Sequence, residues 1–153
     1  MRRCCLLVLT PVLLAACGST KHVETSTTPT GADESAARFA VRVQAQLKRG
    51  RFAQAWRTLH PAEKREVSAH RLASCYPKNQ FPGTVTFRAT KTRDVRWLVP
   101  GTSSSVPAKE VTVTVTSAGG PKQTLAQHLV RVSGGWAWML SKQYFSAAKA
   151  GSC

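Results

Sequence analysis

The sequence has few acidic residues and none of the short motifs that mark the common enzyme classes. Of its 153 residues, 7 are Asp or Glu and 22 are Lys or Arg. GxSxG, HExxH, P-loop and GxGxxG patterns do not occur, so hydrolase and nucleotide-binding functions have no basis in the sequence. His60, His70 and His128 lack the i, i+4 spacing that places two metal ligands on one helix face. The sequence therefore predicts neither a metal site nor a cofactor.

Long hydrophobic runs are also scarce. The clearest one lies near the start of the chain, where Arg2 and Arg3 precede an apolar run over residues 4–14 and the small residues Ala15 and Ala16. A membrane-spanning helix needs roughly 20 apolar residues to cross a hydrocarbon core of about 30 Å, so this run is too short. A basic start, a short apolar core and small residues before a cleavage point are typical of a secretory signal peptide. We therefore expect residues 1–16 to be removed during export.

Residues Leu14-Ala15-Ala16-Cys17 resemble the lipobox of bacterial lipoproteins. The resemblance implies that Cys17 receives a diacylglyceryl group and becomes the first residue of a chain anchored to the outer face of the bacterial cell membrane. Two acyl chains anchor a protein stably, whereas one is marginal. The Ser/Thr-rich segment that completes residues 17–32 is typical of a flexible tether, which leaves residues 33–153 as the folded domain. The alternative is an ordinary signal peptide with a cysteine near its end by chance.

The folded domain keeps only Cys75 and Cys153 of the five cysteines, because Cys4 and Cys5 leave with the signal peptide and Cys17 carries the lipid. Exported proteins meet an oxidising environment, in which two remaining cysteines are expected to form a disulfide. The bridge would close a loop of about 79 residues and stabilise the fold by roughly 4 to 5 kcal/mol in the chain-entropy model. A metal or redox pair is the alternative, but no CxxC motif supports it.

Three helices are predicted in the first half of the domain. Apolar residues at spacings of three and four indicate an amphipathic helix over residues 33–49 and a shorter one over residues 52–59. Pro61 suits the start of a third helix, and Ser68 is a good cap for its final turn before residue 77. The helical part of the domain is therefore expected to end at residue 76.

The hydrophobic period changes to two after Thr84, which indicates strands. We expect strands over residues 85–99, 111–116, 124–133 and 136–140, with Gly134-Gly135 as the tight turn of the last hairpin. The apolar residues of the first strand are expected on one face, with a bulge or break at residues 90–92: Val85, Phe87, Ala89, Val95, Trp97 and Val99.

These elements predict an α+β domain in which three N-terminal helices pack on a curved four-stranded antiparallel sheet. Four features occur together: RGRFAQAWRTLHP, the pair Cys75-Tyr76, the GGWAWML hairpin, and the ending from Tyr144-Phe145 to Cys153. They resemble small actinobacterial lipoproteins of the nuclear transport factor 2-like, cystatin-related superfamily. The resemblance covers roughly residues 35–153 and implies a cone-like roll whose interior is an enzyme site in some members. A plain cystatin-like roll, with one helix on a sheet, is the alternative fold.

Four residues are candidates for the lining of such a cone: Trp56, Tyr76, His128 and Trp138. His128 shares strand parity with Val130 and is expected inside, as a base, a ligand contact or a hydrogen-bonded core residue. No acid is expected beside it, because Asp94 and Glu110 fall at outward-facing strand positions. We therefore expect a non-catalytic domain that binds a small apolar ligand or an envelope protein. An isomerase- or cyclase-like enzyme centred on His128 is the alternative.

Basic side chains exceed acidic ones along the whole domain. Without Arg2 and Arg3, 20 basic and 7 acidic side chains remain, a net charge of +13. An exported, anchored domain meets anionic lipid headgroups and acidic cell-wall polymers rather than nucleic acid, so electrostatic docking on that surface is one interpretation. A basic surface that is simply solvated is the other. By analogy with domains beside penicillin-binding enzymes, an accessory role in cell-wall assembly is a third hypothesis.

Overall fold

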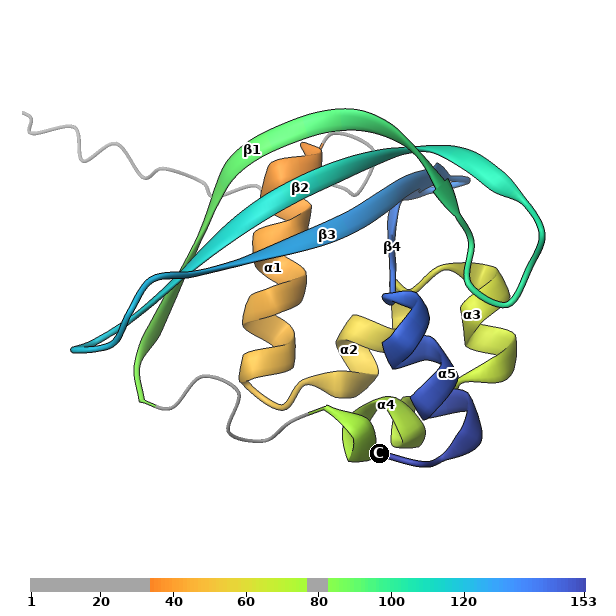
Figure 1. The fold of residues 1–153 in the computed structure, drawn as a ribbon, viewed down its shortest axis with the longest axis horizontal. Helices are drawn as coiled ribbons and strands as arrows, with labels where there is room; N and C mark the ends of the chain where they lie inside the picture. Colours follow the sequence, from red (N-terminus) through yellow and green to blue (C-terminus); the bar gives the residue numbers. More distant parts are fainter. Residues whose placement is uncertain (1–33, 77–82) are drawn as a thin grey trace, which may run out of the picture.

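The computed structural model describes residues 34–76 and 83–153; the predicted signal peptide, the lipidation site Cys17 and the tether lie outside the described residues. Within the described ranges, four helices precede a four-stranded sheet and a fifth helix follows it (Figure 1). The elements are α1 Ala36–Lys48, α2 Phe52–Arg57, α3 Pro61–Glu66, α4 Ala69–Cys75, β1 Val85–Leu98, β2 Ser105–Ser117, β3 Gln123–Val132, β4 Gly135–Met139 and α5 Lys142–Ala150.

The four strands form an antiparallel sheet in which each strand pairs with the next along the chain, in the order β1-β2-β3-β4. The strands β1, β2 and β3 arch over α1, while the short helices gather beside β4 (Figure 1). The predicted α+β class and the four-stranded antiparallel sheet are therefore confirmed.

The prediction of three helices is wrong in two places. The segment predicted as one helix from Pro61 onwards is two helices, because Val67 is extended at φ −121° and ψ 113°. Ser68 then caps α4, with its Oγ accepting a hydrogen bond from the Arg71 N–H at 3.2 Å. The helix α5 is an addition, capped by Ser141 and ended by Gly151, which takes the left-handed φ of 69° that favours glycine.

Helix α1 covers one face of the sheet, which we call the inner face. Ser35 caps the helix by accepting from the Arg38 N–H at 3.3 Å. The apolar stripe of α1 is buried against inward-facing residues of β2, β3 and β4, and the largest of its members is Phe39, 2% exposed. The opposite side of the sheet is the outer face.

A β-bulge at Thr90 changes which residues of β1 point to each face of the sheet. Ala89 pairs with Val113, but Lys91 pairs with Thr112, so Thr90 is an extra residue in β1. Before the bulge the odd-numbered residues of β1 face inwards. After it they face outwards, where a second apolar cluster collects Val95, Trp97, Val99, Val106, Ala108, Val130, Val132, Ala137 and Met139. The prediction of a bulge near this position is confirmed, but the expectation of one apolar face along the whole strand is wrong.

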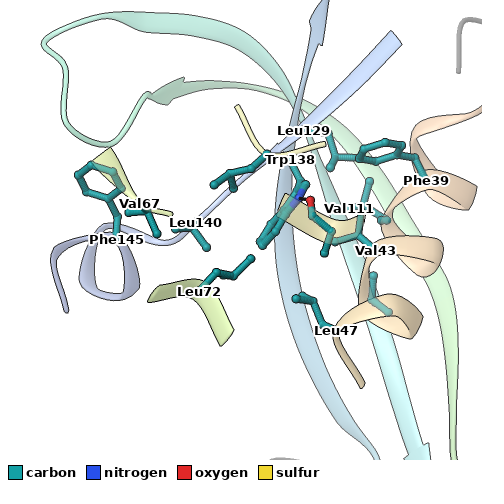
Figure 2. Close-up of a cluster of buried hydrophobic side chains, with 14 of the residues drawn as sticks. Phe39, Val43, Leu47, Val67, Leu72, Val111, Leu129, Trp138, Leu140 and Phe145 are labelled. Carbon is teal, nitrogen blue, oxygen red and sulfur yellow. Dashed lines mark hydrogen bonds between the residues drawn. The ribbon is translucent and has the colours of Figure 1, made fainter. Parts of the chain in front are cut away.

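Trp138 of β4 links the sheet to the short helices. Its indole Nε1–H donates to the Ala55 carbonyl at 2.8 Å, and its backbone pairs with Thr58 and His60 (3.1 and 2.9 Å). The Thr58–His60 backbone therefore covers the open edge of β4, which would otherwise expose unpaired N–H and C=O groups. Figure 2 shows the Trp138 ring among Leu47 of α1, Leu72 of α4 and Leu140.

A disulfide between Cys75 and Cys153 ties the end of α4 to the residues after α5, as predicted. The two Cα atoms lie 4.9 Å apart, within the usual range for a disulfide. The bridge joins residues separated by 78 positions in the sequence. It therefore holds α5 against α4 and the inner core.

Candidate functional site

A cavity of about 220 Å³ lies on the inner side of the sheet, between α1, α4, β3 and the segment from Trp138 to the start of α5. Apolar side chains form much of its wall: Leu47, Leu72, Leu125, Trp138 and Leu140. The polar side chains at the cavity belong to Gln44, Gln127, Ser141, Tyr76 and Tyr144. An apolar hollow with a few convergent polar groups is the usual form of a small-molecule site.

Gln127 supplies the most deeply buried polar group of this wall. It is the inward-facing residue between Leu125 and Leu129 on β3 and is 4% exposed. The Gln44 Nε2 on α1 donates to the Gln127 Oε1 at 3.2 Å. The Gln127 Nε2 has no hydrogen-bond partner among the described residues. Buried amide N–H groups are almost always paired in folded proteins, so this one is an exception that requires a reason.

Two tyrosines place phenolic hydroxyls at the same cavity. Tyr76 follows α4 and packs against Phe52, with ring centroids 5.6 Å apart, and its buried hydroxyl has no partner within the described part of the chain. The Tyr144 hydroxyl donates to the Leu72 carbonyl at 3.4 Å. Burial raises the pKa of Tyr76 to about 12 and raises the pKa of Tyr144 further. Both phenols therefore keep their protons at neutral pH and can donate hydrogen bonds.

The cavity wall contains no charged or imidazole side chain among its lining residues. Its polar groups are two amides, two phenols and one hydroxyl. None of these exchanges a proton near neutral pH without a neighbouring base. The chemistry that this wall supports is therefore hydrogen bonding and apolar contact.

Of the four residues predicted to line one pocket, two lie at this cavity and two lie elsewhere. Tyr76 and Trp138 line the cavity. Trp56 does not: its Nε1–H donates to the Val67 carbonyl at 2.7 Å, which fixes the extended residue between α3 and α4. His128 does not line it either, because its side chain lies on the outer face of β3, stacked on Trp97. The structure therefore places two of the four residues at this cavity and the other two elsewhere.

His128 has the carboxylate neighbour that the sequence analysis did not expect. It pairs across the sheet with Glu110 of β2, and its Nε2 lies 3.2 Å from the Glu110 Oε2. The Arg93 Nε–H donates to the other oxygen of Glu110 at 2.8 Å, and the Trp97 ring stacks on the imidazole at 14° between planes. Burial lowers the pKa of His128, although the hydrogen bond to Glu110 opposes the shift. The register between β2 and β3 is what shows that Glu110 and His128 are neighbours. Strand parity alone does not say which residues of two strands pair.

Glu63 of α3 is a second group that the sequence analysis missed. It has no exposed surface, and both carboxyl oxygens accept from the Leu140 N–H, at 3.2 and 3.3 Å. Burial raises the pKa of Glu63 to about 8, while the hydrogen bond from Leu140 opposes the shift. Glu63 does not line the cavity. Its carboxyl instead satisfies the N–H at the point where β4 leads into α5.

Three basic residues project from the outer face of β1: Arg88, Lys91 and Arg93, which we call the basic strip. The bulge at Thr90 brings the last two to the same face as Arg88. Few acids balance them. Among the described residues, Glu63 is buried and each other acid is in an ion pair: Glu34 with Arg42, Glu66 with Lys149, Asp94 with Lys109 and Glu110 with Arg93. The described surface is therefore strongly positive.

Two other kinds of feature are absent from the described residues. No group of three metal-binding side chains comes together within residues 34–76 and 83–153. None of the helices in these ranges is long and apolar enough to span a membrane. No protein family, curated protein or solved structure matches the chain.

Proposed function

We propose that the protein is a membrane-anchored extracytoplasmic lipoprotein whose single domain binds a small, largely apolar ligand without transforming it. One observation carries the proposal: an inner cavity with an apolar wall is lined by Gln127, whose buried Nε2 has no acceptor among the described residues. A bound molecule is the simplest partner for such a donor. The lipobox-like residues before Cys17 support the anchor.

The cone-like roll of the nuclear transport factor 2-like superfamily is part of this proposal. The arch of β1 to β3 over α1 supports it (Figure 1). In such a roll the ligand site would lie between the curved sheet and its helices, which is where the cavity occurs. The fold by itself does not determine activity, so the function is argued from the cavity wall.

Binding is favoured over catalysis because of what lines the cavity. An isomerase or cyclase would need a base within hydrogen-bond reach of the substrate. The predicted base His128 and its partner Glu110 lie on the outer face, with the sheet between them and the cavity. The groups that do line the cavity are phenols with raised pKa values and neutral amides.

Native mass spectrometry tests the proposed binding. The sample is the soluble mature chain, residues 17–153 with Cys17→Ser, released from an exporting bacterial host. We expect a retained small-molecule adduct that disappears when Leu125→Trp fills the cavity, because Leu125 lines it and is only partly buried. The matched control is Leu98→Trp, at a residue that is 51% exposed. A bare mass in the wild type, or an adduct that survives in Leu125→Trp, would contradict the proposal.

The anchor has a separate test in cells. Cys17→Ala removes the thiol that would be acylated, so we expect the protein to leave the membrane fraction. Fractionation of wild-type and variant cells followed by immunoblotting measures this. A variant that stays in the membrane fraction to the wild-type extent sinks the lipid-anchor proposal.

The basic strip favours a second function, docking on an anionic cell-wall polymer. Arg88 and Lys91 are exposed on one face, and the acids that could neutralise the described surface are already buried or paired. Charge complementarity of this kind gives binding that weakens as salt screens it. An accessory role in wall assembly would require such contact.

Co-sedimentation with purified cell wall tests this second function. We expect pelleting at low salt that is lost at high salt, and a clear reduction in the double variant Arg88→Gln/Lys91→Gln. The control variant Arg38→Gln/Arg49→Gln removes the same charge from exposed positions in and just after α1. Equal loss in both variants would show that only net charge matters, and pelleting indifferent to salt would exclude the electrostatic account.

A further inference from the structure

We infer that the cavity takes an uncharged, largely apolar molecule with a hydrogen-bond-accepting oxygen, such as the carbonyl of a ketone, ester or amide, held by Gln127 and Tyr76. This inference rests on the proposed binding function and adds the chemical class of the ligand. It depends on three features of the wall: a free amide donor, a free phenol donor and the lack of charge.

The side-chain amides of Gln44 on α1 and Gln127 on β3 form one hydrogen bond, and one amino group remains unpaired whichever way the two amides are turned. The Gln44 Nε2 donates to the Gln127 Oε1, and the Gln127 amino group has no acceptor within residues 34–76 and 83–153. If both amides were turned round, the free amino group would belong to Gln44, which also lines the cavity. One hydrogen bond between two amides uses one N–H and one oxygen, so an entire amino group stays available. The wall therefore presents a donor for a ligand acceptor.

The Tyr76 hydroxyl is a second donor, on the cavity-lining residue that follows α4. The hydroxyl is buried and has no partner among the described residues. Burial raises the Tyr76 pKa to about 12, so the hydroxyl stays protonated. Tyr144 differs, because its hydroxyl already donates to the Leu72 carbonyl. A carbonyl oxygen has two lone pairs and can therefore accept from either donor or from both.

The lining residues exclude ions from the ligand class. No Lys, Arg or His is available to balance a carboxylate or phosphate, and no Asp or Glu to balance a cation. A charge transferred into such a wall would lose its hydration without gaining a counter-ion. The volume of about 220 Å³ also restricts size, since it lies below the roughly 300–1,000 Å³ of sites for drug-sized molecules. The ligand portion that enters is therefore one ring or a short chain.

Three probes of matched shape separate the polar contact from simple apolar filling. Acetophenone carries the carbonyl, isopropylbenzene replaces its oxygen with a methyl group, and benzoate replaces the methyl group with a charged oxygen. Each is titrated into the soluble mature chain, with affinity read from the NMR shift of the Trp138 indole N–H. Trp138 lines the cavity, so its signal reports occupancy. We expect acetophenone to bind about tenfold tighter than isopropylbenzene, and benzoate to bind most weakly.

Variants assign the contact to particular donors. Gln127→Met keeps the shape of the side chain and removes one of the two donors, so acetophenone affinity should fall severalfold towards that of isopropylbenzene, whose own affinity should not change. Tyr76→Phe removes a single oxygen and covers the case in which Gln127→Met does not fold; it should weaken acetophenone alone, by about tenfold at most. Tyr144→Phe is the matched control, at a cavity tyrosine whose hydroxyl is already used.

The outcomes distinguish this inference from the function on which it rests. Equal affinities of acetophenone and isopropylbenzene, or tighter binding of benzoate, would overturn the inferred ligand class while leaving cavity binding in place. Equal effects of Tyr76→Phe and Tyr144→Phe would also overturn it. Failure of all three probes to shift the Trp138 signal would contradict the binding function itself.

Discussion

At the scale of single residues, Glu63 shows how a buried acid couples this fold to pH. Its folded-state pKa of about 8 lies above the ordinary value of 4.5. Between these two values the native protein holds a proton that the unfolded chain has released. The free energy of unfolding therefore falls as pH rises through this window, by up to about 1.4 kcal/mol per pH unit.

Two histidines have the opposite effect on the pH dependence of stability, at lower pH. The pKa values of His60 and His128 are lowered, mainly by burial, so the unfolded chain binds more protons below the ordinary value of 6.5. Their contribution to stability therefore rises with pH through the ordinary value of 6.5 and levels off about one pH unit above it. The difference between the wild type and a Glu63 variant isolates Glu63, because both chains keep these histidines.

We predict that the wild type loses about 1 to 2 kcal/mol of unfolding free energy relative to Glu63→Gln between pH 6.5 and 8. Urea unfolding followed by circular dichroism measures both. Glu66→Gln on the same helix is the control, because Glu66 is exposed and pairs only with Lys149 among the described residues. A difference between the wild type and Glu63→Gln that stays constant over this range would show that Glu63 is not a buried neutral acid.

Other single residues explain why the candidate site could not be found from the sequence. Tyr76 and Trp138 are candidates from the sequence because a small domain buries most of its large aromatics in the core and can place one or two at a pocket mouth. Gln127 has no sequence signal beyond an inward strand parity, and its importance lies in a missing partner that only the packing of α1 reveals. A buried donor without an acceptor lowers the stability of the folded protein by about 1 to 3 kcal/mol. Its presence therefore favours an acceptor supplied by a ligand.

At the scale of elements, the sequence predicts whatever depends on local pattern. Helix α1 follows from its apolar stripe and Ser35 cap, and the strands follow from alternation. Two features each depend on a single residue: the break between α3 and α4 at Val67, and the bulge in β1 at Thr90. Hydrophobic periodicity is an average over several residues, so it does not detect them. The bulge at Thr90 turns Val95 and Trp97 to the outer face, which parity counted from Val85 misplaces.

The β1–β2 loop and α5 provide a test at this scale. A Cβ added at Gly101 would lie 2.7 Å from the Phe145 ring, and Gly101 has a left-handed φ of 80°. Gly101→Ala should therefore lower stability by about 2 to 3 kcal/mol through both clash and strain. Gly119→Ala shares the left-handed φ of 73° but meets nothing within 4 Å, so it should cost only about 1 kcal/mol. Equal thermal shifts in the two variants would mean that the loop does not rest on α5.

At the scale of the whole molecule, the disulfide supports the cavity. Cys75 ends α4 and Cys153 follows α5, while Leu72, Tyr76 and Tyr144 of this region line the cavity. A bridge of this span restricts the unfolded chain strongly and also fixes one wall of the cavity relative to the other. Stability and ligand binding should therefore weaken together when the bridge is lost.

The double variant Cys75→Ser/Cys153→Ser is predicted to lose about 4 to 5 kcal/mol of unfolding free energy in the chain-entropy model. We also expect weaker binding of acetophenone, because α5 is no longer held to α4. Chemical unfolding and the Trp138 titration measure the two effects. Unchanged binding in a folded but destabilised variant would show that the bridge stabilises the chain without shaping the cavity.

The most direct test of the central claim is a crystal structure of the soluble mature chain as purified from an exporting host. The account predicts electron density for a small molecule in the inner cavity, with an oxygen within hydrogen-bond distance of the Gln127 or Gln44 amide. A cavity closed by its own side chains, with the Gln127 amino group bonded to a protein carbonyl, would contradict the claim that this fold is built to hold a ligand.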